Sequence, residues 1–238
     1  MIDLPHEKKA LIASFLKSAT MVELYQQYAW GHDTWETGFN DIVSLEQQTG
    51  TAVRSQQLGR SHVIAIAEWG GYRDPFRILC AKDPLMLPLY HGTRIAPFIE
   101  NDPVLPVRMI NQQTRGIGPA CASRILRFAM PSLYGAIDSR IVRVFGQGDP
   151  DSARFPLLDL IAEPGENGRW SIGRQDWPGE YGTWLLILRH IARQLNMAHE
   201  PCPHPQTFLR AELRSWGMWV PADVEMALFS YALQEIGR

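Results

Sequence analysis

The sequence has few cysteines, few lysines and no long apolar run, and each shortage excludes a class of protein. The three cysteines lie far apart without paired spacing, and the seven histidines show no metal-ligand spacing, so neither a disulfide framework nor a metal site is indicated. No apolar run approaches the roughly 18 residues of a membrane-spanning helix. Residues 1–9 lack the shape of a secretory signal peptide. We therefore expect a cytoplasmic protein with no metal, no membrane contact and no obligate protein partner.

The formal net charge is also small, at −2 for 238 residues, so the chain as a whole is not a polyanion binder. Hydrophobic residues make up 45% of the chain and charged residues 20%, which is ordinary for a globular protein. Lysine occurs only at positions 8, 9, 17 and 82, so arginine supplies most of the positive charge. Because arginine binds phosphate with two parallel hydrogen bonds, contact with nucleic acid would have to come from a local cluster of arginines.

The arginines are concentrated in the segment between Val107 and Arg143. That segment contains one acidic residue, Asp138, and six arginines: Arg108, Arg115, Arg124, Arg127, Arg140 and Arg143. A local excess of this kind is typical of a surface that binds a nucleic-acid backbone.

A glycine turn followed by a helix stands at the centre of this segment. Gly116 and Gly118 flank Ile117, and Pro119 follows where its fixed φ and missing N–H favour the start of a helix. Apolar residues then recur at helical spacing until Pro131. Glycines permit φ > 0, and the free N–H groups at such a helix start suit a phosphate. The alternative is an ordinary turn between two helices.

Asp138 follows Gly118 by twenty residues and precedes a short helical stretch, residues 139–143. An aspartate in this position predicts an N-cap. A fixed carboxylate can also serve catalysis, because a negative charge stabilises positive charge that develops in a reaction. The pattern leaves both a structural and a catalytic interpretation of Asp138 open.

The stretch G-I-G-P-A-C-A-S-R-I-L-R-F, followed by A-I-D-S-R, resembles the helix-hairpin-helix DNA glycosylases. It is most similar to the bacterial 8-oxoguanine DNA glycosylase-fold proteins, over about residues 100–145. The resemblance implies an all-α fold of two helical lobes with the active cleft between them and a helix-hairpin-helix element at about 103–130. It also implies double-stranded DNA as the partner and an alkali ion on the hairpin carbonyls. The chain departs from the family where Thr114-Arg115 replaces the common Leu-Pro.

The resemblance also implies a role for individual residues. Asp138 would be the catalytic carboxylate, acting after the target base has left the stack. The DNA contacts would come from the hairpin and the helices that follow it: Arg115, Gly116, Ile117, Gly118, Ser123, Arg124, Arg127 and Arg140.

One departure from the family bears on mechanism. Members that also cleave the DNA strand carry a lysine just after the second glycine, whereas this chain has Pro119-Ala120 there and no lysine after Lys82. The predicted site therefore lacks a nucleophilic amine. We expect a monofunctional glycosylase that uses water. The alternative from another class is a non-catalytic DNA-binding module in which Asp138 only caps a helix.

Residues 147–182 are predicted to form a loop or lid insertion, because prolines and glycines interrupt them throughout. Within it, Trp170, Trp177 and Asp176 could line a base pocket, since aromatic rings stack on a flipped base and carboxylates bond its polar substituents. Such a lining favours a bulky modified pyrimidine of foreign (phage) DNA. The alternative substrate is 8-oxoguanine, which the family resemblance suggests. The same tryptophans could instead anchor a surface loop to the core.

The spacing of apolar residues and the residues typical of helix ends predict a single helical domain over residues 1–238. We find no stretch where apolar and polar residues alternate as they do in a strand. Thr20 and Glu23 form a predicted capping box, and Ser55 is predicted to cap a later helix. Trp30 and Trp69 fit the core better than a base pocket. The predicted helices cover residues 5–29 (two helices), 34–48, 55–69, a stretch from 103 into the glycine turn, 119–130, 139–143, 183–196, 206–216 and 222–236.

Overall fold

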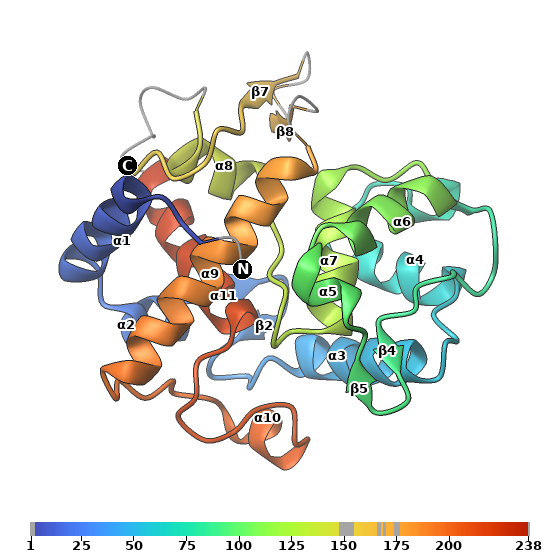
Figure 1. Ribbon diagram of the computed structural model, residues 1–238, viewed down its shortest axis with the longest axis horizontal. Coiled ribbons are helices and arrows are strands. Elements are labelled where there is room, and N and C mark those ends of the chain that lie inside the picture. The colour runs from blue at the N-terminus through green and yellow to red at the C-terminus, as the bar shows by residue number, and fades with distance from the viewer. Residues whose placement is uncertain (1–2, 148–154, 166–167, 169, 174–176, 238) are drawn as a thin grey trace.

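The computed structural model describes residues 3–147, 155–165, 168, 170–173 and 177–237. This part of the chain is mostly helical, which confirms the predicted class in its coarse form. It contains eleven α-helices and only short strands (Figure 1). The helices form two groups on either side of the molecule.

One group combines the two ends of the chain. Its centre is α11, which packs against α2, α8 and α9. The sequence of α11 is apolar around most of its circumference, as expected for a helix that is covered on several sides. The helices of this terminal group are α1 (His6–Ser18), α2 (Met21–Gln26), α8 (Ser139–Phe145), α9 (Gly179–Met197), α10 (Gln206–Arg210) and α11 (Pro221–Ile236).

The other group is built from the middle of the chain around α7, which packs against α3, α4 and α6. Residues 130–138 lead from α7 of this group to α8 of the terminal group (Figure 1). Asp138 is the last residue before α8 and lies 3.8 Å from Arg124 of α7. The helices of this central group are α3 (Asn40–Arg54), α4 (Arg60–Trp69), α5 (Phe98–Asn101), α6 (Leu105–Gln113) and α7 (Pro119–Ala129).

Four antiparallel strand pairs correct the expectation of a chain without strands. Pairs of two or three residues are too short to show alternation of apolar and polar residues, so the sequence pattern missed them. The pair β3–β6 matters most for the site, because it ties the segment after α4 to the turn between α6 and α7. The pairs are β1 (Ala29–Trp30) with β2 (Asp33–Thr34), β3 (Leu79–Cys80) with β6 (Thr114–Arg115), β4 (Tyr90–His91) with β5 (Arg94–Ile95), and β7 (Ala162–Pro164) with β8 (Trp170–Ile172).

Two predicted helix caps are absent, and a side chain from a distant segment caps α4 instead of the predicted one. Thr20 precedes α2 but its side chain makes no capping hydrogen bond. Ser55 lies at the C-terminal end of α3 instead of starting α4. The N–H of Arg60, in the first turn of α4, donates to Asp83 (3.1 Å). The local pattern could not reveal this cap, because the acceptor comes from 23 residues away.

Four buried charged side chains join the two groups of helices; we call them the buried ion network, and they are Glu46, Arg127, Arg214 and Asp223. Each is at most 7% exposed. Glu46 of α3 accepts hydrogen bonds from Arg127 of α7 (2.8 Å) and from two nitrogens of Arg214 (2.7 and 3.0 Å). The Nε of Arg214 donates to Asp223 of α11 (2.8 Å). The network thus connects α3 and α7 with α11.

Asp223 is held ionised within this network. Burial alone would raise its pKa, but the positive charge of Arg214 and the hydrogen bond with His204 outweigh the burial and lower the pKa. The Nε2 of His204 lies 2.9 Å from a carboxylate oxygen of Asp223. Both oxygens of Asp223 are therefore occupied.

Replacing Arg214 with glutamine should destabilise the fold strongly, because Glu46 and Asp223 would keep buried charges without their guanidinium partner. Removing one member of a buried pair typically costs about 3–5 kcal/mol. The matched control is Arg108→Gln, which removes a half-exposed partner of Asp102 and should cost less than about 1 kcal/mol. Urea unfolding at neutral pH measures both, and equal free-energy losses would contradict the importance assigned to the network.

Candidate functional site around Asp138

Asp138 caps α8, as the sequence predicts. Its Oδ1 accepts hydrogen bonds from the backbone N–H groups of Arg140 (2.9 Å) and Ile141 (3.1 Å). Its Oδ2 pairs with the guanidinium of Arg140 (2.9 Å) and lies 3.8 Å from that of Arg124. Asp138 is 5% exposed. One oxygen therefore serves the helix, and the other faces two arginines.

Aromatic rings surround these two arginines. The guanidinium of Arg140 lies over the ring of Trp30 (4.9 Å to the centroid) and near that of Phe229 (5.8 Å). The guanidinium of Arg124 lies 5.7 Å from the ring of Trp30 and 5.9 Å from that of Trp69. The side chain of Arg140 is 38% exposed, and Trp30 is half-buried. The cluster therefore reaches solvent on the side of Arg140 and Trp30.

The two tryptophans are fixed in place by their indole nitrogens. The Nε1 of Trp30 donates to the carbonyl of Trp69 (2.7 Å), and the Nε1 of Trp69 donates to Asp33 (2.8 Å). Asp33 is itself buried and accepts from the N–H groups of Asp41 and Ile42, so it anchors the start of α3. Local sequence contains no signal for this arrangement, since Trp30 and Asp138 lie more than 100 residues apart.

A second carboxylate, Glu225 of α11, lies behind the segment that carries Asp138. Burial raises the pKa of Glu225 to about 7; Arg127 opposes this shift, and the negative charge of Asp138 adds to it. The backbone N–H of Ala136 donates to Glu225. Gly135 permits this close approach, because a Cβ there would lie 2.9 Å from the Cβ of Glu225.

The glycine turn has the conformation that its sequence predicts. Gly116 has φ +83° and packs against the backbone of Arg77. Gly118 is the N-cap of α7, and Pro119 is its first residue. The first amides of α7 therefore have no side-chain cap. Arg115 is exposed, and Ile117 is half-buried.

Three residues predicted to contact DNA are buried instead, which corrects that interpretation. Ser123 is fully buried. Its hydroxyl donates a hydrogen bond to the carbonyl of Ile137 and accepts one from the N–H of the same residue. Arg127 is 1% exposed and belongs to the buried ion network. Arg124 is 8% exposed and donates to the carbonyl of Gly70 (3.2 Å) while facing Asp138. An arginine that faces a buried acid has the same helical spacing as one that faces solvent, so the pattern could not separate them.

The aromatic residues of the predicted base pocket have other contacts. Trp170 lies under the guanidinium of Arg143 (4.3 Å to the ring centroid). Trp177 packs on Tyr181 with ring centroids 5.2 Å apart. Asp176 lies outside the described residues. Thus the rings found beside the arginines of Asp138 are Trp30, Trp69 and Phe229.

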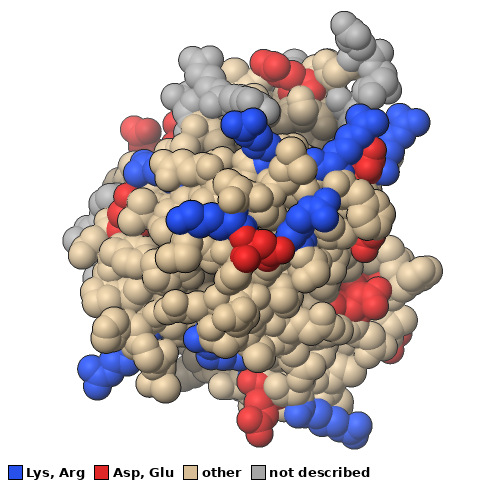
Figure 2. Space-filling model, turned by 90° about the vertical axis from the view of Figure 1, so that its right-hand side faces the viewer, with Lys and Arg blue, Asp and Glu red and all other residues tan. Residues whose placement is uncertain are grey.

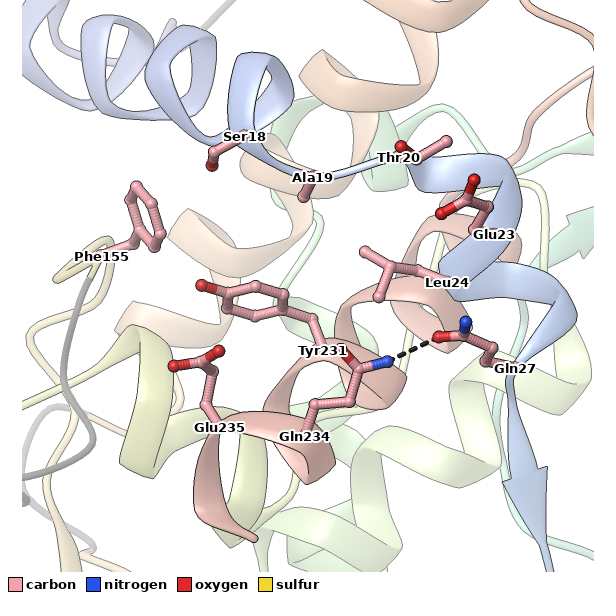
Figure 3. A pocket seen from close by; sticks show the side chains of 10 residues that line it. All are labelled: Ser18, Ala19, Thr20, Glu23, Leu24, Gln27, Phe155, Tyr231, Gln234 and Glu235. Atoms are coloured by element: carbon pink, nitrogen blue, oxygen red, sulfur yellow. Dashed lines mark hydrogen bonds between the residues drawn. The ribbon is translucent and has the colours of Figure 1, made fainter. Parts of the chain in front are cut away.

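Two cavities open elsewhere on the described surface. One, of about 500 Å³, lies between the α1–α2 junction and the end of α11, where Gln234 donates to Gln27 (Figure 3). The other, of about 400 Å³, lies beside α9 and includes Arg189 and Arg193. Neither cavity is lined by Asp138 or by the glycine turn.

One buried cluster among the described residues has the donor types of a metal site. Potential ligand atoms of Cys202, His204 and Asp223 lie within 4.8 Å of one another. Both carboxylate oxygens of Asp223 already accept hydrogen bonds, and one of the donors is the guanidinium of Arg214. A cation there would lie beside this positive charge, so the cluster is better explained by its hydrogen bonds.

Comparisons with protein-family models, with curated proteins and with solved structures found no match. No helix in the described part of the chain combines the length and apolar character needed to cross a bilayer. The geometry around Asp138 is therefore the main support for a functional interpretation.

Replacing Glu225 with glutamine should flatten the pH dependence of stability between about pH 4.5 and 7. Because folding raises this pKa, the folded protein favours protonated Glu225, and stability is lost as pH rises through about 7. The loss is on the order of 1.4 kcal/mol per pH unit at most. Thermal unfolding at several pH values measures it, with the exposed Glu68→Gln as control. An unchanged profile in Glu225→Gln would show that another group causes the dependence.

Proposed function

We propose that this chain is a monofunctional DNA glycosylase that flips a modified or damaged base out of double-stranded DNA and hydrolyses its N-glycosidic bond. The observation that carries the proposal is the setting of Asp138. Its carboxylate is fixed at a helix start and faces two arginines, whose guanidinium groups lie against aromatic rings. The helix before it begins at an uncapped glycine turn inside an arginine-rich segment.

The chemistry follows from this setting. The two backbone amides and the neighbouring guanidinium of Arg140 hold the carboxylate of Asp138 in one position. A fixed negative charge stabilises the cation-like sugar as the bond between C1′ and the base nitrogen breaks. The electron pair of that bond leaves with the base. A water molecule supplies the hydroxyl that bonds C1′, and the proton that this water loses passes to the base. The carboxylate of Asp138 forms no bond and is unchanged at the end.

The flipped base would stack on the ring of Trp30 after Arg140 moves off it. Arg140 can make this movement because its side chain is 38% exposed. Its charge-pair partner, Asp138, is only two residues away on the same turn, so the pair can be kept. Its donors can then bond hydroxyl or carbonyl groups of the base. The substrate that we propose is a bulky, hydroxyl-rich pyrimidine of foreign (phage) DNA, with 8-oxoguanine as the alternative. Trp170 and Trp177, whose rings contact Arg143 and Tyr181, then lie outside this stacking site.

The DNA backbone would be held at the turn between α6 and α7. The amides at Gly116, Ile117 and Gly118, together with the uncapped start of α7, offer donors and a positive dipole to one phosphate. Hairpin carbonyls would hold an alkali ion, and the exposed Arg115 would add a second phosphate contact. Basic side chains stand mainly on the upper half of the face formed by the central group (Figure 2). The central and terminal groups would act as the two lobes that enclose the DNA.

Replacing Asp138 with asparagine should lower base excision by about 10²–10³-fold, the usual cost of losing one preorganised charge. Asparagine also accepts N-cap hydrogen bonds, so folding and DNA binding should remain. Single-turnover base release from duplexes containing glucosylated hydroxymethylcytosine, 8-oxoguanine or uracil measures the effect. Asp102→Asn, which alters another partly exposed carboxylate, is the control and should excise normally.

The same measurement separates the alternatives. Wild-type-like excision by Asp138→Asn would show that Asp138 is only a cap. DNA binding by the wild-type protein without base release from any duplex would favour the non-catalytic DNA-binding module.

The product should be an abasic site in an uncleaved strand, because no lysine lies near Asp138 in the sequence. Lys8 bonds the carbonyl of Leu157, and Lys9 pairs with Asp3, so both have partners elsewhere. Borohydride added during turnover should trap no protein–DNA adduct, while heating in alkali should cleave the product. Efficient trapping would show that an amine reaches the sugar and would contradict the monofunctional mechanism.

A further inference from the structure

A large apolar side chain projects from the segment between α4 and β3. Phe76 is 66% exposed in the 3₁₀ turn η1 (Pro75–Arg77), and Leu79, three residues later, is 58% exposed. Arg73 and Arg77 on either side of Phe76 are also exposed. An aromatic ring in water contributes little to folding.

The turn is held firmly, so the exposure of Phe76 does not come from a loose segment. Arg60 of α4 donates to the carbonyl of Phe76 (2.7 Å) and to the carbonyl of Ile78 (2.9 Å). Pro75 and Ile78, the residues before and two after Phe76, are buried. These contacts fix the backbone on both sides of the ring and direct the ring away from the core.

The turn also lies between the two parts of the proposed site. On one side, Leu79 pairs with Arg115 in the β3–β6 ladder, and the carbonyl of Arg77 would lie 3.1 Å from a Cβ on Gly116. On the other side, the carbonyl of Gly70 accepts a hydrogen bond from Arg124, which faces Asp138. Residues 70–79 thus connect the proposed phosphate-binding turn to the Asp138 cluster.

We propose that Phe76 is the wedge that enters the base stack and fills the space left by the flipped base. Taking a base out of a duplex costs a few kcal/mol of pairing and stacking, and an inserted apolar side chain offsets part of this cost by stacking and by leaving water. Arg73 and Arg77 would lie near the phosphates that flank the opened step. The inference rests on the proposed function and adds the residue that makes flipping possible in paired DNA.

The test compares Phe76→Ala with Phe76→Trp and with Trp216→Ala, which removes an aromatic ring that is 79% exposed elsewhere. Single-turnover excision is measured on the duplex from which the wild-type protein releases the base fastest: glucosylated hydroxymethylcytosine, 8-oxoguanine or uracil. Phe76→Ala should lose about 10–100-fold on the normally paired base. It should recover to within a few-fold of wild type when the target base lies opposite an abasic site, where little pairing has to be broken. Phe76→Trp and Trp216→Ala should excise normally.

Two further measurements distinguish a failure of the wedge proposal from a failure of the proposed glycosylase function. The salt dependence of DNA binding should stay unchanged in Phe76→Ala, whereas Arg115→Ala should reduce its slope by about one unit. A 2-aminopurine beside the target base should brighten on binding of wild type and not of Phe76→Ala. If the wild-type protein releases a base and Phe76→Ala matches it on paired DNA, the wedge is wrong and the glycosylase stands. If the wild-type protein neither binds any duplex nor releases a base from one, both proposals fall.

Discussion

The buried ion network is the constraint on which the arrangement of this molecule depends. Glu46 accepts hydrogen bonds from both Arg127 and Arg214, and Arg214 also donates a hydrogen bond to Asp223. These residues come from α3, α7, the segment after α10, and α11, so a single set of charges sets the position of the central helices relative to the terminal ones. Buried charges are costly unless every one is paired. The network therefore tolerates few alternative packings of the two groups.

The Asp138 cluster depends on that arrangement. Arg124 and Arg127 lie one turn apart on α7, so fixing Arg127 against Glu46 also directs Arg124 toward Asp138. Glu225 lies on α11, two residues after Asp223, and bonds the segment that leads into α8. Trp30 and Trp69 complete the cluster from β1 and α4. The proposed catalytic carboxylate is thus supported by both groups of helices, which gives it a rigid position where they meet.

The features predicted correctly from the sequence depend on backbone conformation and on residues close by in the chain. Gly116 needed φ > 0, Pro119 suited the first position of a helix, and Asp138 suited an N-cap, and the structure has all three features. Where it failed, the partner came from far along the chain. Ser123, Arg124 and Arg127 were expected on a DNA surface, yet their partners belong to other segments that α7 packs against. Ser55 was expected to start a helix that Asp83 caps instead.

By itself, the sequence determined that the chain is mostly helical and where a glycine turn, a helix start and a capping carboxylate lie, because these depend on backbone conformation and on neighbours a few residues away. Only the tertiary structure decided which arginines are buried. It also placed Trp30 beside Arg140, the ion-pair partner of Asp138, although Trp30 and Asp138 lie more than 100 residues apart. It also decided that burial raises the pKa of Glu225 to about 7. The physical reason is that burial and charge pairing depend on which distant segments meet, and the order of residues along one helix does not contain that information.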